Sequence, residues 1–197
     1  MTEDDVPKID WIHLPHGVEP ISLWECMHDG EVLSCVSNDA ERTVTFELSV
    51  PHLFYKDEKD LNILLKIEEV TSVRAAGSFR RIGQFEEPKD ASNEERNRLI
   101  KEYWAKWREE TLTWSDFESA LDTDPLQIMD ASLVSHKNDN TLKVAGFLDG
   151  VKFDDIHFEI FVRGRSIGLS RSDDGNITLE SFMDLGRNYW NDVRTGE

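Results

Sequence analysis

The sequence predicts an α+β fold, in which predominantly antiparallel β-sheet is packed by two main helices. Three observations carry this prediction. Apolar residues alternate with polar ones in both halves of the chain, as in Thr43–Val50 and Ile156–Val162, and a period of two is typical of half-buried strands. Helical spacing occurs in the middle of the chain and at its carboxy-terminal end. The strands come in runs instead of alternating with helices, which argues against a parallel sheet.

After an irregular segment, Met1–Pro20, the first strand region extends from Ile21 to Arg81. Its expected strands are Val32–Val36, Thr43–Val50 and Leu61–Ile67, with Val70–Val73 and Phe79–Ile82 as two further candidates. A turn is expected at Asn38-Asp39, because these residues favour turn conformations.

The middle of the chain is expected to be helical. Ser92 with Glu95 forms a capping-box pattern, and an apolar stripe that includes Trp104 and Trp107 predicts an amphipathic helix to about Glu110. This stripe is expected to fill the core. A second capping pattern, Ser115 with Glu118, predicts a short helix through Leu121 that ends before Asp124-Pro125.

The strand pattern returns from Leu126 onward. The expected strands are Leu142–Leu148, Ile156–Val162 and Ile167–Ser170, followed by a hairpin turn at Asp173–Asn176 and a final helix over Thr178–Val193.

The chain is expected to form one domain, residues 1–197, and it contains a candidate internal repeat. Met27–Ser34 resembles Ile128–Ser135, with Asp29 matching Asp130. Two similar β units, 21–83 and 126–177, would then be joined by a helical segment, 92–122. Chance similarity remains the alternative, and an aspartate before a strand also has a structural explanation, since it accepts hydrogen bonds from nearby backbone N–H groups.

The charge is strongly negative. Lys and Arg total 22 and Asp and Glu total 40, a formal net charge of −18 at pH 7. Such a chain repels phosphate, which argues against direct binding to nucleic acid or to an anionic membrane. It favours attraction to a basic protein partner, although a well-solvated surface explains the charge equally simply.

Other features indicate a cytoplasmic protein. No apolar run approaches the roughly 18 residues of a membrane span, and Glu3, Asp4 and Asp5 do not suit a secretory signal. Cys26 and Cys35 are too few for a disulfide framework and are expected to be reduced thiols.

A small set of residues is predicted to bind a partner or ligand. His28-Asp29 combines an imidazole with a carboxylate, but neighbours in a strand face opposite ways, so the pair needs a turn to act together. Arginines cluster in each half and suit a carboxylate or phosphate, unless they pair with surface carboxylates. Among Trp104, Trp107 and Trp114, the best candidate for exposure is Trp114. The predicted binding residues are His28, Asp29, Asp130, Arg74, Arg163, Arg165 and Trp114.

No catalytic residue, cofactor or metal site is predicted. His13, His16, Cys26, His28 and Asp29 carry metal-ligand chemistry but lack any recognised zinc spacing.

The segment Leu23–Ser34 resembles the opening of small acidic bacterial immunity proteins of polymorphic toxin systems, through an aromatic residue and His28-Asp29-Gly30 before the first strand. The resemblance implies a non-catalytic protein that binds and neutralises a toxin. Two alternatives remain open: a small-molecule or anion-binding protein or enzyme that uses His28, Asp29 and the arginines, and an acidic mimic of nucleic acid. The sequence leaves the oligomeric state open.

Overall fold

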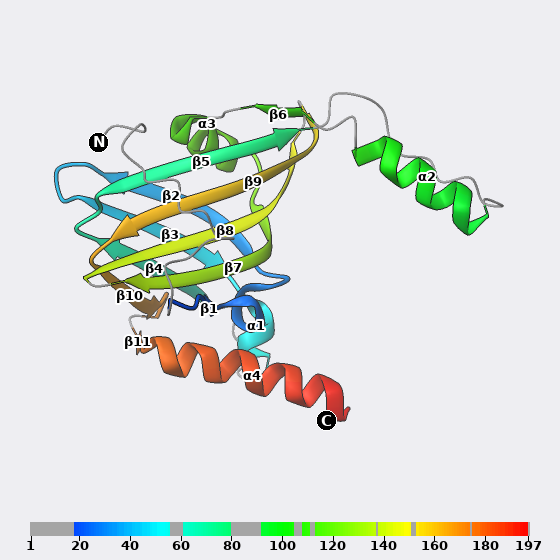
Figure 1. Ribbon diagram of the computed structural model, residues 1–197. Helices are drawn as coiled ribbons and strands as arrows, with labels where there is room; N and C mark the ends of the chain where they lie inside the picture. Colours follow the sequence, from blue (N-terminus) through cyan, green and yellow to red (C-terminus); the bar gives the residue numbers. More distant parts are fainter. Residues whose placement is uncertain are drawn as a thin grey trace.

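The fold is α+β, as predicted. The computed structural model describes residues 18–55, 61–79, 92–104, 108–110, 113–136, 138–150, 153–173 and 175–196. Within these residues an eleven-stranded antiparallel sheet is accompanied by helices (Figure 1). The strands are β1 Ile21–Ser22, β2 Glu31–Asn38, β3 Thr43–Ser49, β4 Asn62–Glu68, β5 Ser72–Phe79, β6 Arg108–Glu110, β7 Leu126–His136, β8 Asp139–Gly150, β9 Phe153–Gly164, β10 Ser166–Arg171 and β11 Asn176–Ile177. The helices are α1 Trp24–Met27, η2 Pro51–Phe54 (a 3₁₀ turn), α2 Asn93–Trp104, α3 Trp114–Leu121 and α4 Leu179–Thr195.

Two three-stranded meanders form the centre of the sheet. The strand order is β11-β10-β4-β3-β2-β7-β8-β9-β5-β6, and β1 pairs with β7. The meanders β2-β3-β4 and β7-β8-β9 meet where Glu31 and Val32 pair with Gln127 and Leu126. The strand that follows each meander pairs with the last strand of the other meander. Strand β5, which follows β4, pairs with β9, and strand β10, which follows β9, pairs with β4.

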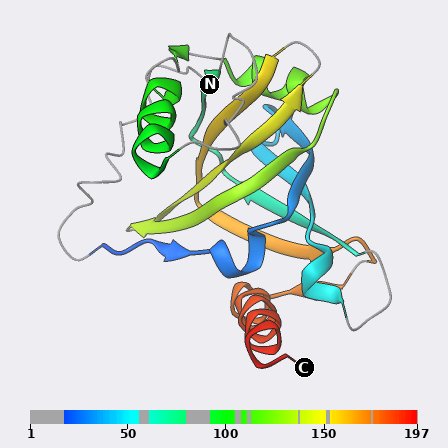
Figure 2. The ribbon, with the colours of Figure 1, turned by 90° about the vertical axis from the view of Figure 1, so that its right-hand side faces the viewer.

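This exchange curls the sheet around its core. Ser166 of β10 pairs with Glu68 of β4, and only a few residues away Arg163 of β9 pairs with Ser72 of β5. The pairings β4–β10 and β5–β9 therefore form one ladder with a bend between them. Gly164 lies at the bend. A Cβ atom there would lie 2.6 Å from the Glu68 carbonyl oxygen, and hence the bend requires a residue without a side chain. Figure 2 shows the two groups of strands facing each other.

The enclosed core is apolar. Its largest fully buried side chains include Phe46, Phe117, Phe158 and Phe182, which come from β3, α3, β9 and α4. Phe117 contacts Phe158 with ring centroids 5.5 Å apart. Of the helices, α3 packs on β2 and β5 and α1 packs on β7, whereas α4 packs on α1 and η2 and adds Phe182 to the core.

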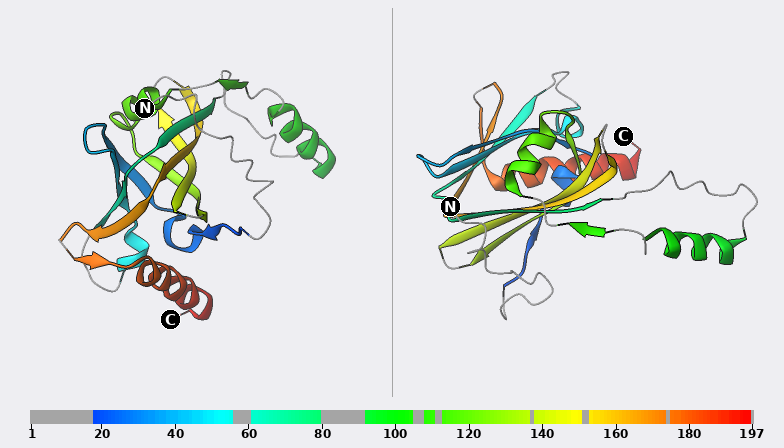
Figure 3. Two further views of the ribbon diagram at one scale, coloured as in Figure 1. Left: turned by 60° about the vertical axis from the view of Figure 1, so that its left-hand side comes forward. Right: turned by 90° about the horizontal axis from the view of Figure 1, so that it is seen from above.

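The helix predicted over 92–110 is shorter than expected. Ser92 caps α2 by accepting a hydrogen bond from the Glu95 amide at 3.2 Å, but α2 ends at Trp104, and Arg108–Glu110 pair with β5 instead. Both views in Figure 3 draw α2 to one side of the sheet, and its described side chains are exposed from Asn93 through Arg98. The Trp104 side chain and Trp107 lie outside the described residues.

Three further boundaries differ from the sequence predictions. Trp24–Met27 is a helical turn, because Leu23, Cys26 and Met27 at spacings of three and four all face the core. The expected strand at Val70–Val73 begins later, because β5 runs continuously over Ser72–Phe79, and residues 80–82 of the candidate Phe79–Ile82 lie outside the described residues. The capping box of α3 is Thr113 with Asp116, two residues before the predicted pair.

The strand order repeats, but not in the register suggested by sequence. Each meander begins with a bulged strand, and the bulge comes after Val32 in β2 and Ile128 in β7. These positions are 96 residues apart (128 minus 32), whereas the match of Asp29 to Asp130 requires 101 (130 minus 29). Accordingly, Asp29 lies in the turn before β2 while Asp130 lies inside β7.

Candidate functional site

The helices α1 and α4 lie against each other at one end of the sheet (Figure 1). Leu23, Cys26 and Met27 of the first turn are buried, so Trp24 and Glu25 face away from the core. Gly186 of α4 makes the close approach, because a Cβ atom at that position would lie 2.5 Å from the Glu25 carbonyl oxygen. The absence of a side chain at one residue thus brings α4 onto α1.

This contact assembles a chain of aromatic rings. Trp24 stacks on His28 and on Trp190, with centroids 4.5 Å and 5.1 Å away. Tyr189 contacts Trp190 at 5.1 Å and Tyr55 at 5.4 Å. The Trp190 indole N–H donates to the Glu25 carbonyl oxygen at 3.0 Å, which fixes the ring above α1. These five rings come from α1, the turn after η2, and α4.

Apolar exposure is concentrated around the same rings. Four large apolar side chains are clearly exposed among the described residues: Val36 at 62%, Tyr55 at 43%, Met129 at 39% and Val193 at 53%. Tyr55 belongs to the ring chain, and Met129 and Val193 adjoin it. His28 binds the Met129 carbonyl oxygen, and Val193 lies three residues after Trp190, on the same side of the helix. Exposed apolar groups gathered inside a polar rim are typical of interaction sites.

The rim is mainly acidic. Glu25, Asp29 and Asp192 lie on or next to the rings, and Asp192 accepts a hydrogen bond from the Tyr55 hydroxyl. Asp130, which is exposed, follows Met129 in β7. Two cations of α4 lie near this group. The Nη2 atom of Arg194 is 3.8 Å from Glu25 Oε1, and Arg187, which pairs with Asp184, also interacts electrostatically with Glu25. We call this set the α1–α4 surface; it comprises Trp24, Glu25, His28, Asp29, Tyr55, Met129, Asp130, Tyr189, Trp190, Asp192, Val193 and Arg194.

His28 and Asp29 are brought together by a turn. Asp29 adopts a left-handed conformation with φ of 63°, so its carboxylate returns to within 3.5 Å of His28 Nε2. The other ring nitrogen, Nδ1, lies 3.1 Å from the Met129 carbonyl oxygen, and because a carbonyl only accepts, Nδ1 carries the proton in that bond. The imidazole is therefore oriented, with Nε2 directed toward the carboxylate.

A half-buried histidine, whose ring nitrogens are covered, contacts this surface. His52 contacts Tyr189 at a centroid distance of 5.1 Å, and neither of its ring nitrogens meets a hydrogen-bond partner among the described residues. Burial lowers the pKa of His52, and the charge of nearby His28 lowers it further, while the Cys26 backbone and the Asp29 carboxylate oppose the shift. Burial likewise raises the pKa of the Cys26 thiol to about 12, which makes that thiol a poor nucleophile.

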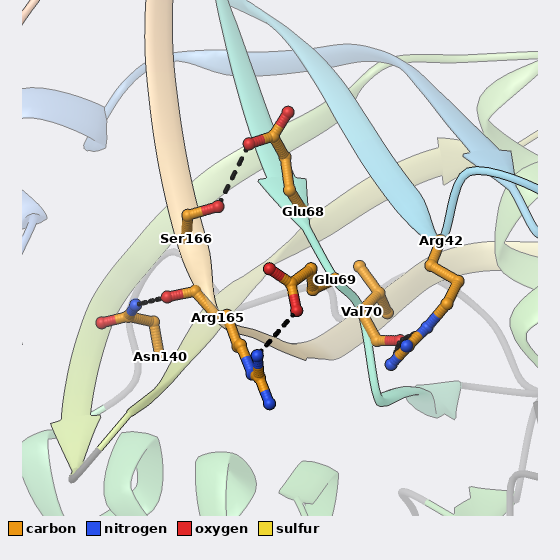
Figure 4. Close-up of polar contacts among 7 residues, drawn as sticks. All are labelled: Arg42, Glu68, Glu69, Val70, Asn140, Arg165 and Ser166. Atoms are coloured by element: carbon orange, nitrogen blue, oxygen red, sulfur yellow. Dashed lines mark hydrogen bonds and ion pairs between the residues drawn. The ribbon is translucent and has the colours of Figure 1, made fainter.

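The predicted arginines belong to a different part of the molecule. Arg163 pairs with Asp139, and Arg165 pairs with Glu69 at 3.0 Å beside the bend of the sheet (Figure 4). Arg74 lies over the Phe161 ring, 6.0 Å from its centroid. Measured along β7, Met129 lies about 23 Å from the last residue of the strand, His136, at the usual rise per residue. The structure therefore joins His28 with Asp29 and places both beside Met129, the residue before Asp130, but leaves the arginines elsewhere. Arg80 and Arg81, which follow Arg74 in the arginine cluster of the first half, lie outside the described residues.

Trp114 is not exposed as predicted. It is 7% exposed and packs on Phe117 and Phe46, and its indole N–H lies 2.9 Å from both Ser37 Oγ and Glu118 Oε1. The residue is the first of α3, where the Thr113 cap turns the ring inward over the core. Among the tryptophan side chains that the structure describes, Trp24 and Trp190 are the ones partly exposed to solvent.

The described part of the chain contains no group of three His, Cys, Asp or Glu side chains arranged to hold a metal ion. His13 and His16 fall outside that part, and both cysteines are free thiols. No helix in the described ranges has the length and apolar character needed to cross a membrane.

Comparison with known proteins yields no relative. No protein-family model, no curated protein and no solved structure matches the chain. The function is therefore inferred from the geometry of the α1–α4 surface.

Replacing Gly186 by alanine is expected to separate α4 from α1, because the added methyl group meets backbone rather than a movable side chain. The free energy of unfolding should fall by about 1–3 kcal/mol, measured by denaturant titration. Gly168→Ala is the matched control, since nothing lies within 4 Å of its Cβ position. Equal stability of the two variants would contradict the packing of α4 on α1.

The stability of the protein should depend on His52 below neutral pH. Because the folded-state pKa lies below the unfolded value of 6.5, the unfolded chain binds the proton first as the pH falls. Stability is therefore complete above pH 6.5 and decreases below it, until the folded-state pKa is reached. His52→Phe should flatten this part of the profile, measured by denaturant titration at several pH values. The exposed His136→Gln variant is the control, and a His52→Phe profile that matches it would refute the assignment.

Proposed function

We propose that this chain is a non-catalytic binding protein that recognises a basic protein through the α1–α4 surface. The observation that carries the proposal is the combination, on one surface, of partly exposed aromatic rings with an excess of carboxylates. Tryptophan and tyrosine dominate the binding energy of protein interfaces, and carboxylates at the rim select a cationic partner. The net charge of −18 extends this attraction over a longer range and would accelerate association.

Immunity to a bacterial toxin is the concrete form of this proposal. The segment His28-Asp29-Gly30, which carries the resemblance to immunity proteins, lies in the α1–α4 surface. Its histidine is oriented by the Met129 carbonyl oxygen and shares the ring chain with Trp24. A cytoplasmic location forms part of this proposal, because neutralisation would take place where the toxin acts.

The geometry favours binding over the small-ligand alternative. A site that used His28, Asp29 and the arginines together would require them to converge, but Arg163 and Arg165 lie at the other end of β7 and pair with Asp139 and Glu69. Cationic side chains already paired with carboxylates are less available to an anionic ligand.

Capture of partners from a lysate of the source organism tests the proposal. The wild-type protein should retain a basic protein at low salt and lose it at high salt, as expected for contacts that salt screens. Trp24→Ala should weaken this binding by at least about 30-fold, the effect of losing an interface hot spot. Val36→Ala, which removes an exposed apolar group on β2, should leave it unchanged.

Circular dichroism and thermal unfolding would verify that both variants are folded. Retention of the partner by Trp24→Ala at wild-type affinity would contradict the proposed surface. The capture of no basic protein at low salt would contradict the proposed function itself.

A further inference from the structure

An arginine of the chain already pairs with a carboxylate of the α1–α4 surface. Arg194, in the last turn of α4, places its Nη2 atom 3.8 Å from the Glu25 carboxylate. Both side chains are well exposed, at 65% for Arg194 and 41% for Glu25. The contact is long compared with the 2.7–2.9 Å of a close charge-assisted hydrogen bond, so it is a loose ion pair at the surface.

Aromatic rings adjoin this ion pair. Trp190 is bonded through its indole N–H to the backbone carbonyl of Glu25, the residue whose carboxylate meets Arg194. Arg194 lies four residues after Trp190 on α4, and residues at this spacing share a helix face. Trp24, next to Glu25 in the chain, stacks on Trp190. Glu25 thus adjoins both indoles, through the chain to Trp24 and through the hydrogen bond to Trp190.

We propose that an arginine of the basic partner docks against Trp24 and Trp190 and pairs with Glu25, and that it displaces Arg194 in doing so. The inference rests on the proposed function and names the chemistry of the contact. Arg194 occupies the position in the unbound chain and lowers the affinity for every competing guanidinium.

Arginine fits this position better than lysine. The guanidinium is planar and weakly hydrated, stacks on aromatic faces and meets a carboxylate through two parallel N–H groups. A lysine ammonium is compact and strongly hydrated, and therefore gains less from flanking indole rings. Displacement of Arg194 is also inexpensive, because exposed ion pairs contribute only about 0–1 kcal/mol.

The test uses the full chain with two defined probes, a tetra-arginine and a tetra-lysine peptide. Binding is followed through the indole N–H signals in nitrogen-15 NMR spectra, and Trp24→Phe and Trp190→Phe assign the two relevant signals. We expect the arginine peptide to shift both signals and to bind more tightly than the lysine peptide. Glu25→Gln should weaken arginine binding, whereas Arg194→Ala should tighten it about two- to five-fold, the range that an exposed ion pair allows.

The matched control is Arg165→Ala. It removes the same charge from a side chain of similar exposure, 62%, which pairs with Glu69 at 3.0 Å beside the bend. If Arg165→Ala tightens binding as much as Arg194→Ala, the effect is one of net charge and the displacement is refuted. Equal affinity for the two peptides would refute the preference for arginine.

The outcomes separate this inference from the proposed function. If lysate capture retains a basic protein while the arginine peptide leaves the Trp24 and Trp190 signals unchanged, the docking position is wrong and the binding function stands. If neither the peptides nor any basic protein binds, both fail together.

Discussion

The bend at Gly164 is the constraint on which the rest of the structure depends. At this point the Arg165 amide donates to the Glu68 carbonyl oxygen at 2.9 Å, and the Thr71 amide donates to the Arg163 carbonyl oxygen at 2.8 Å. These bonds keep the ladder intact where both strands turn, which allows β5 to join one meander and β10 the other. Without the bend the two meanders would form an open sheet with exposed apolar faces, whereas the curled sheet encloses them.

The same arrangement determines where the helices lie. The helix that precedes each meander packs against the first strand of the other meander. Helix α1, which precedes β2, packs against β7, and helix α3, which precedes β7, packs against β2. The two helices differ in how far their tryptophans are covered. Trp114 of α3 is enclosed by Phe46 and Phe117, but Trp24 of α1 is covered only in part by α4. Gly186 brings α4 close enough to align Trp190 with Trp24 and yet leaves the acidic side of α1 facing outward.

The sequence predicts the strands better than it predicts the surface. Alternation in Thr43–Ser49 and Asn62–Glu68 has a single physical cause, one buried face, and is readable from neighbouring residues. The final helix is also predictable, since Thr178 caps it by accepting from the Ser181 amide. The helical turn at Trp24–Met27 is too short for its spacing to be distinguished from a strand.

The α1–α4 surface depends on contacts distant in sequence, and no local pattern indicates them. Trp190 meets Glu25 across the whole chain, and helical spacing alone does not tell whether Trp190 and Val193 lie on the buried side of α4. One local pattern does indicate that part of this face of α4 is exposed. Tyr189 and Trp190 are adjacent in a helix, and neighbours about 100° apart rarely both face a narrow core stripe. The predicted His28 and Asp29 belong to the surface because the turn at Asp29, also invisible to periodicity, folds one onto the other.

Site-specific photocrosslinking tests the central claim most directly. A photoreactive phenylalanine analogue at Tyr55, within the α1–α4 surface, is compared with the same analogue at Val36, an exposed apolar position on β2. We expect that only the residue at position 55 forms a covalent adduct with a basic protein in the lysate, and that the adduct decreases as salt is raised. Equal crosslinking from both positions, or an adduct from position 36 alone, would show that the α1–α4 surface is not where the partner binds.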